Sequence, residues 1–229
     1  MHCKYERARI QHMTPHAAMH ILLRAYLPGS MVLRLDSDQG DFDTLPEAEQ
    51  ALVLRAVATR RVHFAAGRHL ARTVLAELGH PVDALLRQAN GAPDWPPGIR
   101  ASLTHTTGLA GVLAGHSDRF AGIGLDIEQR APFPLAASTI ILTDNEREMA
   151  STALAQCRVF CAKEALYKCL SPLNAPDLDF RDVEIVWKTN GFSARAVSSL
   201  ARNIGELGRV HGFCVHNATH VAAFAFIAI

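Results

Sequence analysis

The stretch Gly122–Glu128 combines an apolar pattern with two acids that could do chemistry. Its apolar residues alternate with small and acidic ones, which is the pattern of a buried strand. Asp126 and Glu128 therefore share one face, about 7 Å apart along the strand. Their face begins with two glycines, which let another backbone or a ligand come close. Two hard oxygen ligands suit Mg²⁺, which leaves its other positions to water and phosphate. The alternative is a strand that runs out into solvent.

A further acid lies in Arg158–Lys168, a segment with strong helix propensity. Glu164 and Lys168 are four residues apart, so their side chains lie on the same face of the helix, one turn from each other. An ordinary surface ion pair has the same spacing and contributes only a few tenths of a kcal/mol. The sequence alone leaves both interpretations open.

Basic residues gather in a helical pattern that stops at Gly79-His80-Pro81. Arg61, Arg68 and Arg72 are spaced to share one face of this helix. They could form an anion-binding rim, although a solvated face is the usual fate of such a run. His105 ends a predicted strand, Ala101–His105, where a single histidine by itself means little.

Turn and cap signals place these residues in a chain that mixes helices and strands. A helix is predicted to start at Thr44-Leu45-Pro46-Glu47, with Thr44 as its cap, and to reach Leu78 with a break near Ala58. Another cap-like start lies at Thr143. Each half runs from helices into strands, with the seam near residue 125. The predicted strands are His20–Leu27, Met31–Leu35, Ala101–His105, Leu109–Gly115, Gly122–Glu128, Val183–Trp187, Phe192–Val197, Val210–His216 and His220–Ile229.

Composition limits the class of protein. The 229 residues carry a net charge of +1, which gives no general case for binding nucleic acid or an anionic membrane. Hydrophobic residues make up 49%, enough for a sizeable core. No stretch is long and uncharged enough to span a bilayer. The five cysteines are odd in number and irregularly spaced, which fits reduced thiols in a cytoplasmic protein.

Three motifs together resemble the 4′-phosphopantetheinyl transferases of the Sfp type, and most of all the branch that includes the enterobactin-synthase component D enzymes. They occur in the family's order and spacing, and the likeness runs from about Arg60 to Phe180. The motifs are Ala101–His105, Gly124–Glu128 and Phe160–Lys168, and the loop Trp95–Gly98 and the stretch Arg60–Arg68 also resemble this branch.

This resemblance implies an enzyme that moves the phosphopantetheine arm of coenzyme A onto a serine of an apo acyl, peptidyl or aryl carrier protein, releasing adenosine 3′,5′-bisphosphate. It implies an α+β fold of two similar halves, residues 1–125 and 126–229, related by pseudo-twofold symmetry with the ligand cleft between them. We expect a cytoplasmic monomer. The carrier could serve fatty-acid, polyketide, nonribosomal-peptide or siderophore assembly, and its expected docking segment is the loop Ala131–Leu142, which contains prolines.

The resemblance also assigns site residues. Mg²⁺, or Mn²⁺ in its place, would bind to Asp126, Glu128 and Glu164. Lys168 would place its charge against the pyrophosphate. His105 would point at the 3′-phosphate of the nucleotide, which would also be bound by Thr104, Arg60, Arg68 and Arg87. Some relatives carry a lysine in a Gly-Lys-Pro loop where this chain has Gly91-Ala92-Pro93, so Arg87 would supply that charge.

Two questions stay open at this level. The general base that accepts the serine proton is expected to be Glu164, with Glu128 acting through a metal-bound water as the alternative. The function itself has two rivals: a catalytically silent module that binds coenzyme A or carrier protein, and a metal-dependent phosphohydrolase. The intact acids argue against the silent module.

Overall fold

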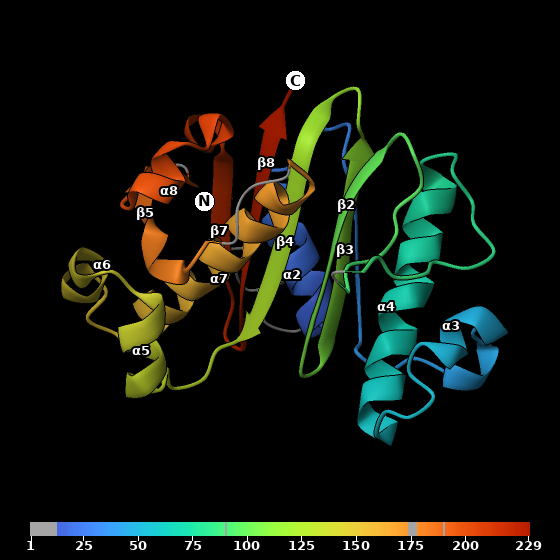
Figure 1. Ribbon diagram of the computed structural model, residues 1–229. Coiled ribbons are helices and arrows are strands. Elements are labelled where there is room, and N and C mark those ends of the chain that lie inside the picture. The colour runs from blue at the N-terminus through green and yellow to red at the C-terminus, as the bar shows by residue number, and fades with distance from the viewer. Residues whose placement is uncertain (1–12, 90, 174–177, 190) are drawn as a thin grey trace, which may run out of the picture.

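The computed structural model describes residues 13–89, 91–173, 178–189 and 191–229. Its strands form two antiparallel sheets, one of three strands in the order β1-β3-β2 and one of five in the order β4-β8-β7-β6-β5 (Figure 1). The α+β class expected from the sequence is confirmed, and the pseudo-twofold relation stays a prediction. The strands are β1 (Val32–Asp36), β2 (Ile99–Thr106), β3 (Leu109–His116), β4 (Phe120–Gln129), β5 (Val183–Lys188), β6 (Gly191–Ala196), β7 (His211–His216) and β8 (His220–Ala228).

Helices cover both sheets. The long helix α4 packs on the three-stranded sheet and α7 packs on β4 and β8 (Figure 1). Within the described residues, no helix is long and apolar enough to cross a membrane. The α-helices are α2 (Pro15–Arg24), α3 (Glu47–Ala51), α4 (Ala58–Glu77), α5 (Leu135–Ile141), α6 (Asp144–Met149), α7 (Ala153–Leu170) and α8 (Ser199–Arg202), and the 3₁₀ turns are η1 (Phe42–Thr44), η2 (Ser171–Leu173), η3 (Phe180–Asp182) and η4 (Gly205–Arg209).

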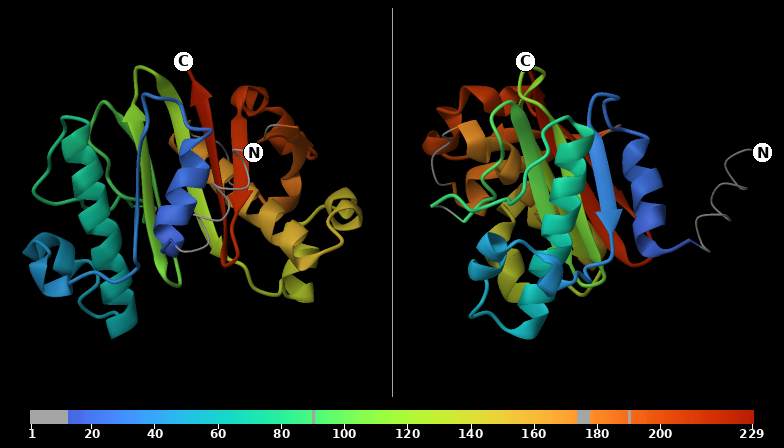
Figure 2. Two further views of the ribbon diagram at one scale, coloured as in Figure 1. Left: turned by 180° about the vertical axis from the view of Figure 1, so that it is seen from behind. Right: turned by 90° about the vertical axis from the view of Figure 1, so that its right-hand side faces the viewer.

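The strand predicted at His20–Leu27 is wrong, because this segment lies largely within helix α2. Pro15 stands in the first turn, where its missing N–H costs nothing. Met19 and Leu23 are buried four residues apart, which is the spacing of one helix face. A short apolar run fits a strand or a helix equally well, and here the packing of one helix face against the sheets stabilises the helix. Seen from behind, α2 lies across the face of the sheets opposite α7, in contact with β1, β7 and β8 (Figure 2).

The predicted helix start near residue 46 is confirmed, but its expected cap is wrong. Pro46 stands at the N-cap of α3, while the hydroxyl of Thr44 donates to the carbonyl oxygen of Asp41 at 2.8 Å. The predicted break is also present, since residues 52–57 separate α3 from α4. Helix α4 then ends before Gly79, whose φ of 78° suits a glycine after a helix.

The bare face of β4 is what brings α7 close to it. A Cβ atom at Gly122 would overlap the carbonyl oxygen of Cys169, and one at Gly124 would overlap that of Ala165. The helix backbone therefore lies directly on the strand. Because Gly122 and Gly124 share their face with Asp126, this contact sets the distance between the acids of β4 and the side chains of α7.

The two sheets meet where β2 lies beside β4, and side chains make the junction. Leu125 N donates to the hydroxyl of Ser102 at 2.9 Å, and Ile127 N donates to the hydroxyl of Thr104 at 3.3 Å. Ser102 and Thr104 point to the same side of β2 because they are two residues apart. Their hydroxyls thus satisfy backbone groups of β4 and hold one sheet against the other.

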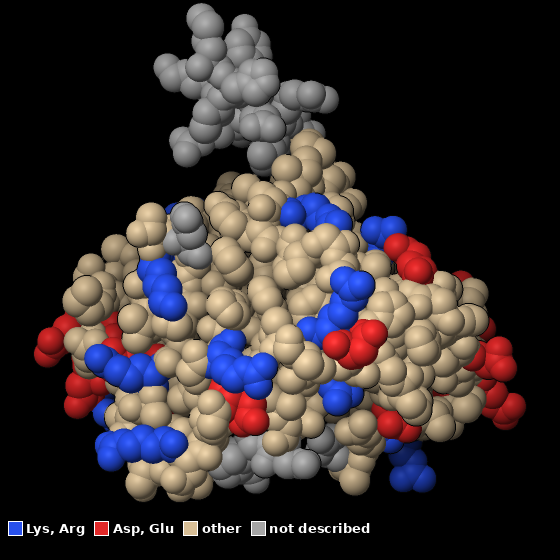
Figure 3. Space-filling view, turned by 90° about the horizontal axis from the view of Figure 1, so that it is seen from above, with Lys and Arg blue, Asp and Glu red and all other residues tan. Residues whose placement is uncertain are grey.

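Charges of both signs are mixed on one face of the molecule. On the face seen from above, basic side chains are interspersed with acidic ones, as the net charge of +1 leads one to expect (Figure 3). Any anion-binding site must therefore be local.

Candidate active site

A cavity of about 430 Å³ opens where α4, β2, β4 and α7 meet. Elements from both sheets contribute to its wall, so the junction of β2 with β4 forms its floor. The nine side chains that the resemblance assigned to the site all line this one cavity: Arg60, Arg68, Arg87, Thr104, His105, Asp126, Glu128, Glu164 and Lys168. Arg61 and Arg72, the other two residues of the possible anion-binding rim, are not among its lining residues, and Arg72 pairs with Glu49 instead.

Asp126 forms the centre of the acidic end. It is 3% exposed, and its Oδ1 accepts from Lys168 Nζ at 2.6 Å and from the Thr104 hydroxyl at 3.2 Å. Lys168 is half-buried, and desolvation lowers its pKa, but the Asp126 carboxylate outweighs this and the net pKa is raised. Asp126 Oδ2 is also buried, and it has no hydrogen-bond partner in the described part of the chain. Buried polar atoms are nearly always paired, so this oxygen indicates a missing ligand.

Glu128 and Glu164 flank Asp126. Burial and then the Asp126 carboxylate raise the pKa of Glu128, Lys168 opposes them, and the resulting pKa is about 7. The pKa of Glu164 is raised by burial and then by Asp126. Burial is the main cause of both shifts, and repulsion from the Asp126 carboxylate adds to it. A bound cation would relieve this repulsion.

The donor set suits a divalent cation, since it offers hard carboxylate oxygens and one of them is unpartnered. The ligands are not assembled, however. Among the residues with described positions, no group of three or more His, Cys, Asp or Glu side chains lies close enough to hold a metal ion. Lys168 also takes one oxygen of Asp126. The binding of a metal by Asp126, Glu128 and Glu164 thus stays a prediction.

The opposite end of the cavity is basic. Arg68 is only 3% exposed, and its Nε has no hydrogen-bond partner within the described residues. Its guanidinium lies 4.4 Å from the centre of the Phe64 ring, and that of Arg87 lies 5.1 Å from the same ring. Burial is the main cause that lowers the pKa of Arg68; Glu49 opposes it, Arg87 and other arginines add to it, and the resulting pKa is about 10. An anion would relieve the repulsion between these cations.

His105 lies beside the arginines. Arg60 Nη1 is 3.0 Å from His105 Nε2 and donates to it. Burial and then the charge of Arg60 lower the pKa of His105, which favours the neutral imidazole that can accept this bond. Gly67 makes this arrangement possible, because it lets α4 approach to within contact of the Leu103 side chain on β2.

The comparisons with known proteins decide the family. Residues 48–115 match the 4′-phosphopantetheinyl transferase N-terminal domain, and residues 122–225 match the 4′-phosphopantetheinyl transferase superfamily. The 4′-phosphopantetheinyl transferase PptT of Mycobacterium tuberculosis is 38% identical over 173 residues, which cover 72% of this chain and 76% of that protein. This chain belongs to the 4′-phosphopantetheinyl transferase superfamily. It is an enzyme of that type.

Other phosphopantetheinyl transferases share this similarity. Npt of Nocardia iowensis is 40% identical over 151 residues, covering 64% of this chain and 68% of that protein. Among solved structures, the acyl carrier protein synthase of Mycobacterium tuberculosis is 27% identical, with a TM-score of 0.37 over 47% of this chain and 96% of its own. The holo-[acyl-carrier-protein] synthase of Helicobacter pylori, solved in complex with coenzyme A, is 18% identical. Its TM-score is 0.39, and the match covers 47% of this chain and 99% of that chain.

Two residues of the transferase were missed in the sequence: His63, which lines the cavity, and its partner Asp38. His63 lines the cavity, and its Nε2 lies 3.1 Å from Oδ2 of the buried Asp38. His63 follows Arg60 by three residues on the same helix face, which was a usable signal. Asp38 gave none, since it lies in an acidic loop of the kind that is usually solvated.

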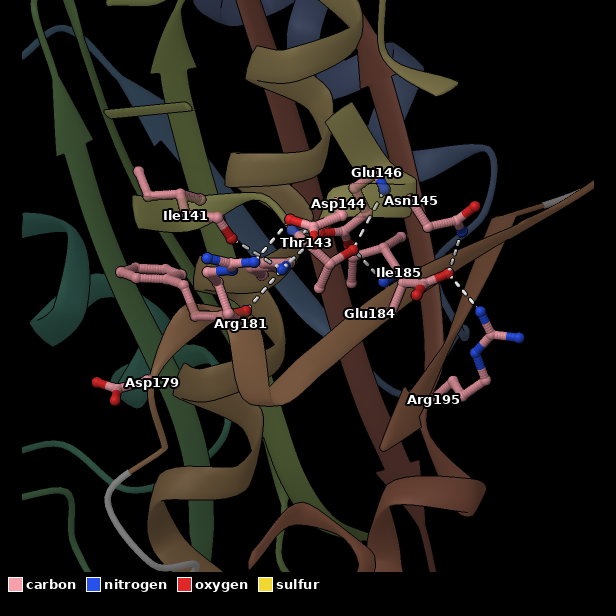
Figure 4. A network of polar contacts seen from close by, with 12 residues as sticks. Ile141, Thr143, Asp144, Asn145, Glu146, Asp179, Arg181, Glu184, Ile185 and Arg195 are labelled. Carbon is pink, nitrogen blue, oxygen red and sulfur yellow. Dashed lines mark hydrogen bonds and ion pairs between the residues drawn. The ribbon is translucent and has the colours of Figure 1, made fainter. Parts of the chain in front are cut away.

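A buried network fixes the transferase's helix α7 behind the cavity (Figure 4). Lys163, next to Glu164, is fully buried, and its Nζ donates to the carbonyl oxygens of Ile141 and Phe180 at 2.9 and 2.6 Å. It also pairs with Glu146 at 2.7 Å. Burial lowers the pKa of Lys163 and Glu146 opposes this. Lys163 points into the protein, while the next residue, Glu164, about 100° further around α7, lines the cavity.

Glu146 connects this network to strand β5 of the five-stranded sheet. Its Oε2 accepts from Thr143 N at 2.9 Å and its Oε1 accepts from Ile185 N at 2.8 Å. Thr143 caps α6 in return by accepting from Glu146 N, so the cap-like start predicted there is confirmed. One carboxylate thus joins α6, α7 and β5.

Proposed function

We propose that this enzyme transfers the 4′-phosphopantetheine arm of coenzyme A to a serine hydroxyl of an apo carrier protein. One observation carries the proposal: the same cavity has an unpartnered atom at each end, counting partners in the described residues alone. At the acidic end it is the carboxylate oxygen Asp126 Oδ2, and at the basic end it is the guanidinium nitrogen Arg68 Nε. Coenzyme A carries a diphosphate, which metal ions bind, and a separate 3′-phosphate. The cavity offers a complement to each.

In this proposal, Asp126, Glu128 and Glu164 hold Mg²⁺, with Mn²⁺ as the alternative ion. When bound, the ion would neutralise charge on the diphosphate as a Lewis acid. The support is the donor chemistry, the unpartnered oxygen of Asp126 and the raised pKa values of Glu128 and Glu164.

The basic residues position the nucleotide. Arg60, Arg68 and Arg87 supply fixed positive charge, and His105 points at the 3′-phosphate. Thr104 holds Asp126 through its hydroxyl and so joins the two ends of the cavity. Lys168 places its ammonium group against the diphosphate, and its bond to Asp126 fixes that position. Positioning and charge neutralisation are most of what phosphoryl transfer asks of a protein.

The reaction forms a bond between the serine oxygen and the β-phosphorus of coenzyme A. It breaks the bond from that phosphorus to the bridging oxygen, which leaves with adenosine 3′,5′-bisphosphate. The serine proton passes to a carboxylate, and Glu164 is the proposed acceptor. Glu128, acting through an intervening water, is the alternative.

The carrier protein is proposed to dock over Ala131–Leu142. The expectation that this segment is a loop is wrong in part, because its second half forms helix α5. Ile140 on this helix is 68% exposed, and Met149 on the following helix is 78% exposed. Exposed apolar side chains of this kind are typical of a contact surface.

The proposal includes the Sfp-type organisation. The chain would act as a monomer in the cytoplasm, with residues 1–125 and 126–229 as two halves related by a pseudo-twofold axis. The cavity lined by both sheets is the feature that favours this arrangement.

The test is a transfer assay. The purified protein is mixed with coenzyme A, Mg²⁺ and a panel of apo carrier domains from fatty-acid, polyketide, nonribosomal-peptide and siderophore assembly, and each carrier is weighed intact. We expect at least one carrier to gain the mass of phosphopantetheine. If every carrier keeps its mass, the proposal is refuted. Loss of coenzyme A would then indicate a phosphohydrolase, and binding without turnover would indicate a silent module.

A further inference from the structure

His63 and Asp38 form a pair at the basic end of the cavity that the proposed mechanism does not use. We infer that His63, held by Asp38, is a further anion-binding residue that recognises the 3′-phosphate of coenzyme A. This inference rests on the proposed function and adds to it a residue that determines nucleotide specificity.

The position of His63 supports this role. It lies three residues after Arg60 on α4, so both side chains reach the same side of the helix. Its ring centre is 5.6 Å from that of His105, and it lines the cavity with 21% of its side chain exposed. The ring thus stands next to the arginine and the histidine already assigned to phosphate, within reach of the same group.

Asp38 is a fixed partner rather than a surface acid. Its side chain is only 7% exposed. Its Oδ2 accepts from Gly108 N at 2.9 Å and its Oδ1 accepts from the Gln39 amide at 2.7 Å. Burial raises the pKa of Asp38, but these two hydrogen bonds and the neighbouring His63 outweigh it and the net pKa is lowered. A carboxylate held in the ionised form can stabilise a charged imidazole beside it.

The chain is built to keep this pair in place. A Cβ atom at Gly40 would overlap the backbone nitrogen of Ala66, so the loop that carries Asp38 lies directly on α4. Gly108, which donates to Asp38, stands in the turn after His105 and has a φ of 81°. Asp38 therefore joins three segments, its own loop, α4 and the turn beyond β2, at the point where His63 and His105 face each other.

The chemistry of the imidazole defines the ligand. With Nε2 facing Asp38, a neutral ring that donates to the carboxylate presents Nδ1 only as an acceptor, which a phosphate repels. A protonated ring donates from both nitrogens. Asp38 and His105 lie beside the ring. The dianion of a phosphate monoester accepts from N–H donors and carries negative charge, so His63 suits the 3′-phosphate better than an uncharged part of the nucleotide.

The acidic end excludes the other phosphates as the partner of His63. Carboxylates and Lys168 surround that end and suit the metal-bound diphosphate. The 3′-phosphate is the remaining anion of coenzyme A, and the basic end is the place left for it. A purely structural role for the pair predicts a different result, because loss of a tether would weaken every nucleotide equally.

The experiment compares coenzyme A with 3′-dephospho-coenzyme A as substrates of the full chain, using a carrier that the wild type modifies. The variants are His63→Gln and Asp38→Asn. The control is His69→Gln, because His69 lies on the same helix but lines a separate hollow with Thr44 and Asp41. Loss of a charge-assisted hydrogen bond should raise the KM for coenzyme A about tenfold in His63→Gln. In His63→Gln, the preference for coenzyme A over 3′-dephospho-coenzyme A should also fall about tenfold. Asp38→Asn should lower this preference as well.

Two outcomes overturn the inference: an unchanged preference in both variants, or an equal rise in KM for both substrates. Calorimetry of nucleotide binding tests the inference independently of the proposed function, because it does not require transfer to a carrier. Adenosine 3′,5′-bisphosphate should bind the wild type more tightly than adenosine 5′-monophosphate, and His63→Gln should lose that difference. If the wild type modifies no carrier, the proposed function fails. If it shows no preference for the 3′-phosphate in either assay, the inference fails.

Discussion

Lys168 Nζ donates to Asp126 Oδ1 at 2.6 Å, across the contact between α7 and β4. The second oxygen of Asp126 is buried beside it without a hydrogen-bond partner in the described residues. One oxygen of this carboxylate thus holds the ammonium group of Lys168, which is proposed to bind the diphosphate. The other oxygen is left to bind a metal ion. This arrangement exists because Gly122 and Gly124 allow α7 to lie on the strand.

The variant Asp126→Asn should lose transfer almost completely while it keeps its fold. The amide can still accept from Thr104 and Lys168, but it removes the charge that would bind the metal. The measurement is the initial rate of carrier modification at several Mg²⁺ concentrations, with the melting temperature as the check on folding. Raising Mg²⁺ should rescue the rate poorly. Asp83→Asn, at an exposed position, is the control. A rate near the wild type would show that Asp126 is not needed.

Lys168→Ala should raise the KM for coenzyme A about tenfold, the effect of one lost charge-assisted hydrogen bond. Its effect on Mg²⁺ dependence should be smaller, because the carboxylates remain. Steady-state rates at varied coenzyme A and varied Mg²⁺ measure the two effects separately. Lys188→Ala, at an exposed lysine of strand β5, controls for the loss of a positive charge. An unchanged KM for coenzyme A in Lys168→Ala would refute the assigned role.

Lys163→Met should lower the free energy of unfolding by roughly 3–5 kcal/mol, the cost of leaving one partner of a buried ion pair uncompensated. Glu146 would keep its buried charge without the ammonium group, while the carbonyl oxygens of Ile141 and Phe180 would lose a donor. Urea unfolding measures the change, and Lys188→Met should shift it by less than about 0.5 kcal/mol. A near-neutral Lys163→Met would mean that the network in Figure 4 does not hold α7.

Gly124→Ala should destabilise the protein by about 1–3 kcal/mol or more, because the new Cβ atom would overlap the backbone of α7. It should also lower the transfer rate, since the helix that carries Glu164 and Lys168 must move away from Asp126. Gly205→Ala is a matched control, because within the described chain a Cβ there would meet open space. Unfolding curves and transfer rates of the two variants give the comparison. Equal stability for both would contradict the close contact of strand and helix.

The raised pKa of Glu128 predicts a pH dependence of stability in the absence of divalent ions. The folded pKa of about 7 exceeds the usual 4.5, so the folded state binds the proton more tightly than the unfolded state. Stability should therefore fall as pH rises from about 4.5 to about 7 and stay low above it. Melting temperatures in chelator across this range test this, and Glu128→Gln should flatten the curve. Added Mg²⁺ should restore stability above pH 7. A flat wild-type curve would count against the repulsion between these acids.

Local patterns predicted most of the elements that carry the cavity. The alternation in β4, the helix propensity around Glu164 and the cap at Thr143 are all properties of neighbouring residues, and the structure has each of them. His20–Leu27 was assigned to a strand although it lies largely in a helix, because the hydrophobic pattern of a short apolar run does not distinguish a helix from a strand. The helix within Ala131–Leu142 was missed because the prolines of this segment favoured a loop.

The pairing of distant residues could not be predicted in the same way. Asp38 and His63 are joined only because a loop packs on α4 at Gly40, and nothing in their spacing indicates it. Lys163 is fully buried, although lysine is almost never buried without a partner, and its partner Glu146 lies on another helix. The use of Ser102 and Thr104 hydroxyls to join two sheets also depends on the tertiary fold.

Metal-dependent transfer is tested most directly by weighing one apo carrier protein, accepted by the wild type, after incubation with coenzyme A and Mg²⁺. We expect the added mass of phosphopantetheine with the wild type, none when Mg²⁺ is chelated, and none with Asp126→Asn. Transfer that continues in chelator, or that continues with Asp126→Asn, would contradict the claim that these carboxylates bind a metal ion at the diphosphate.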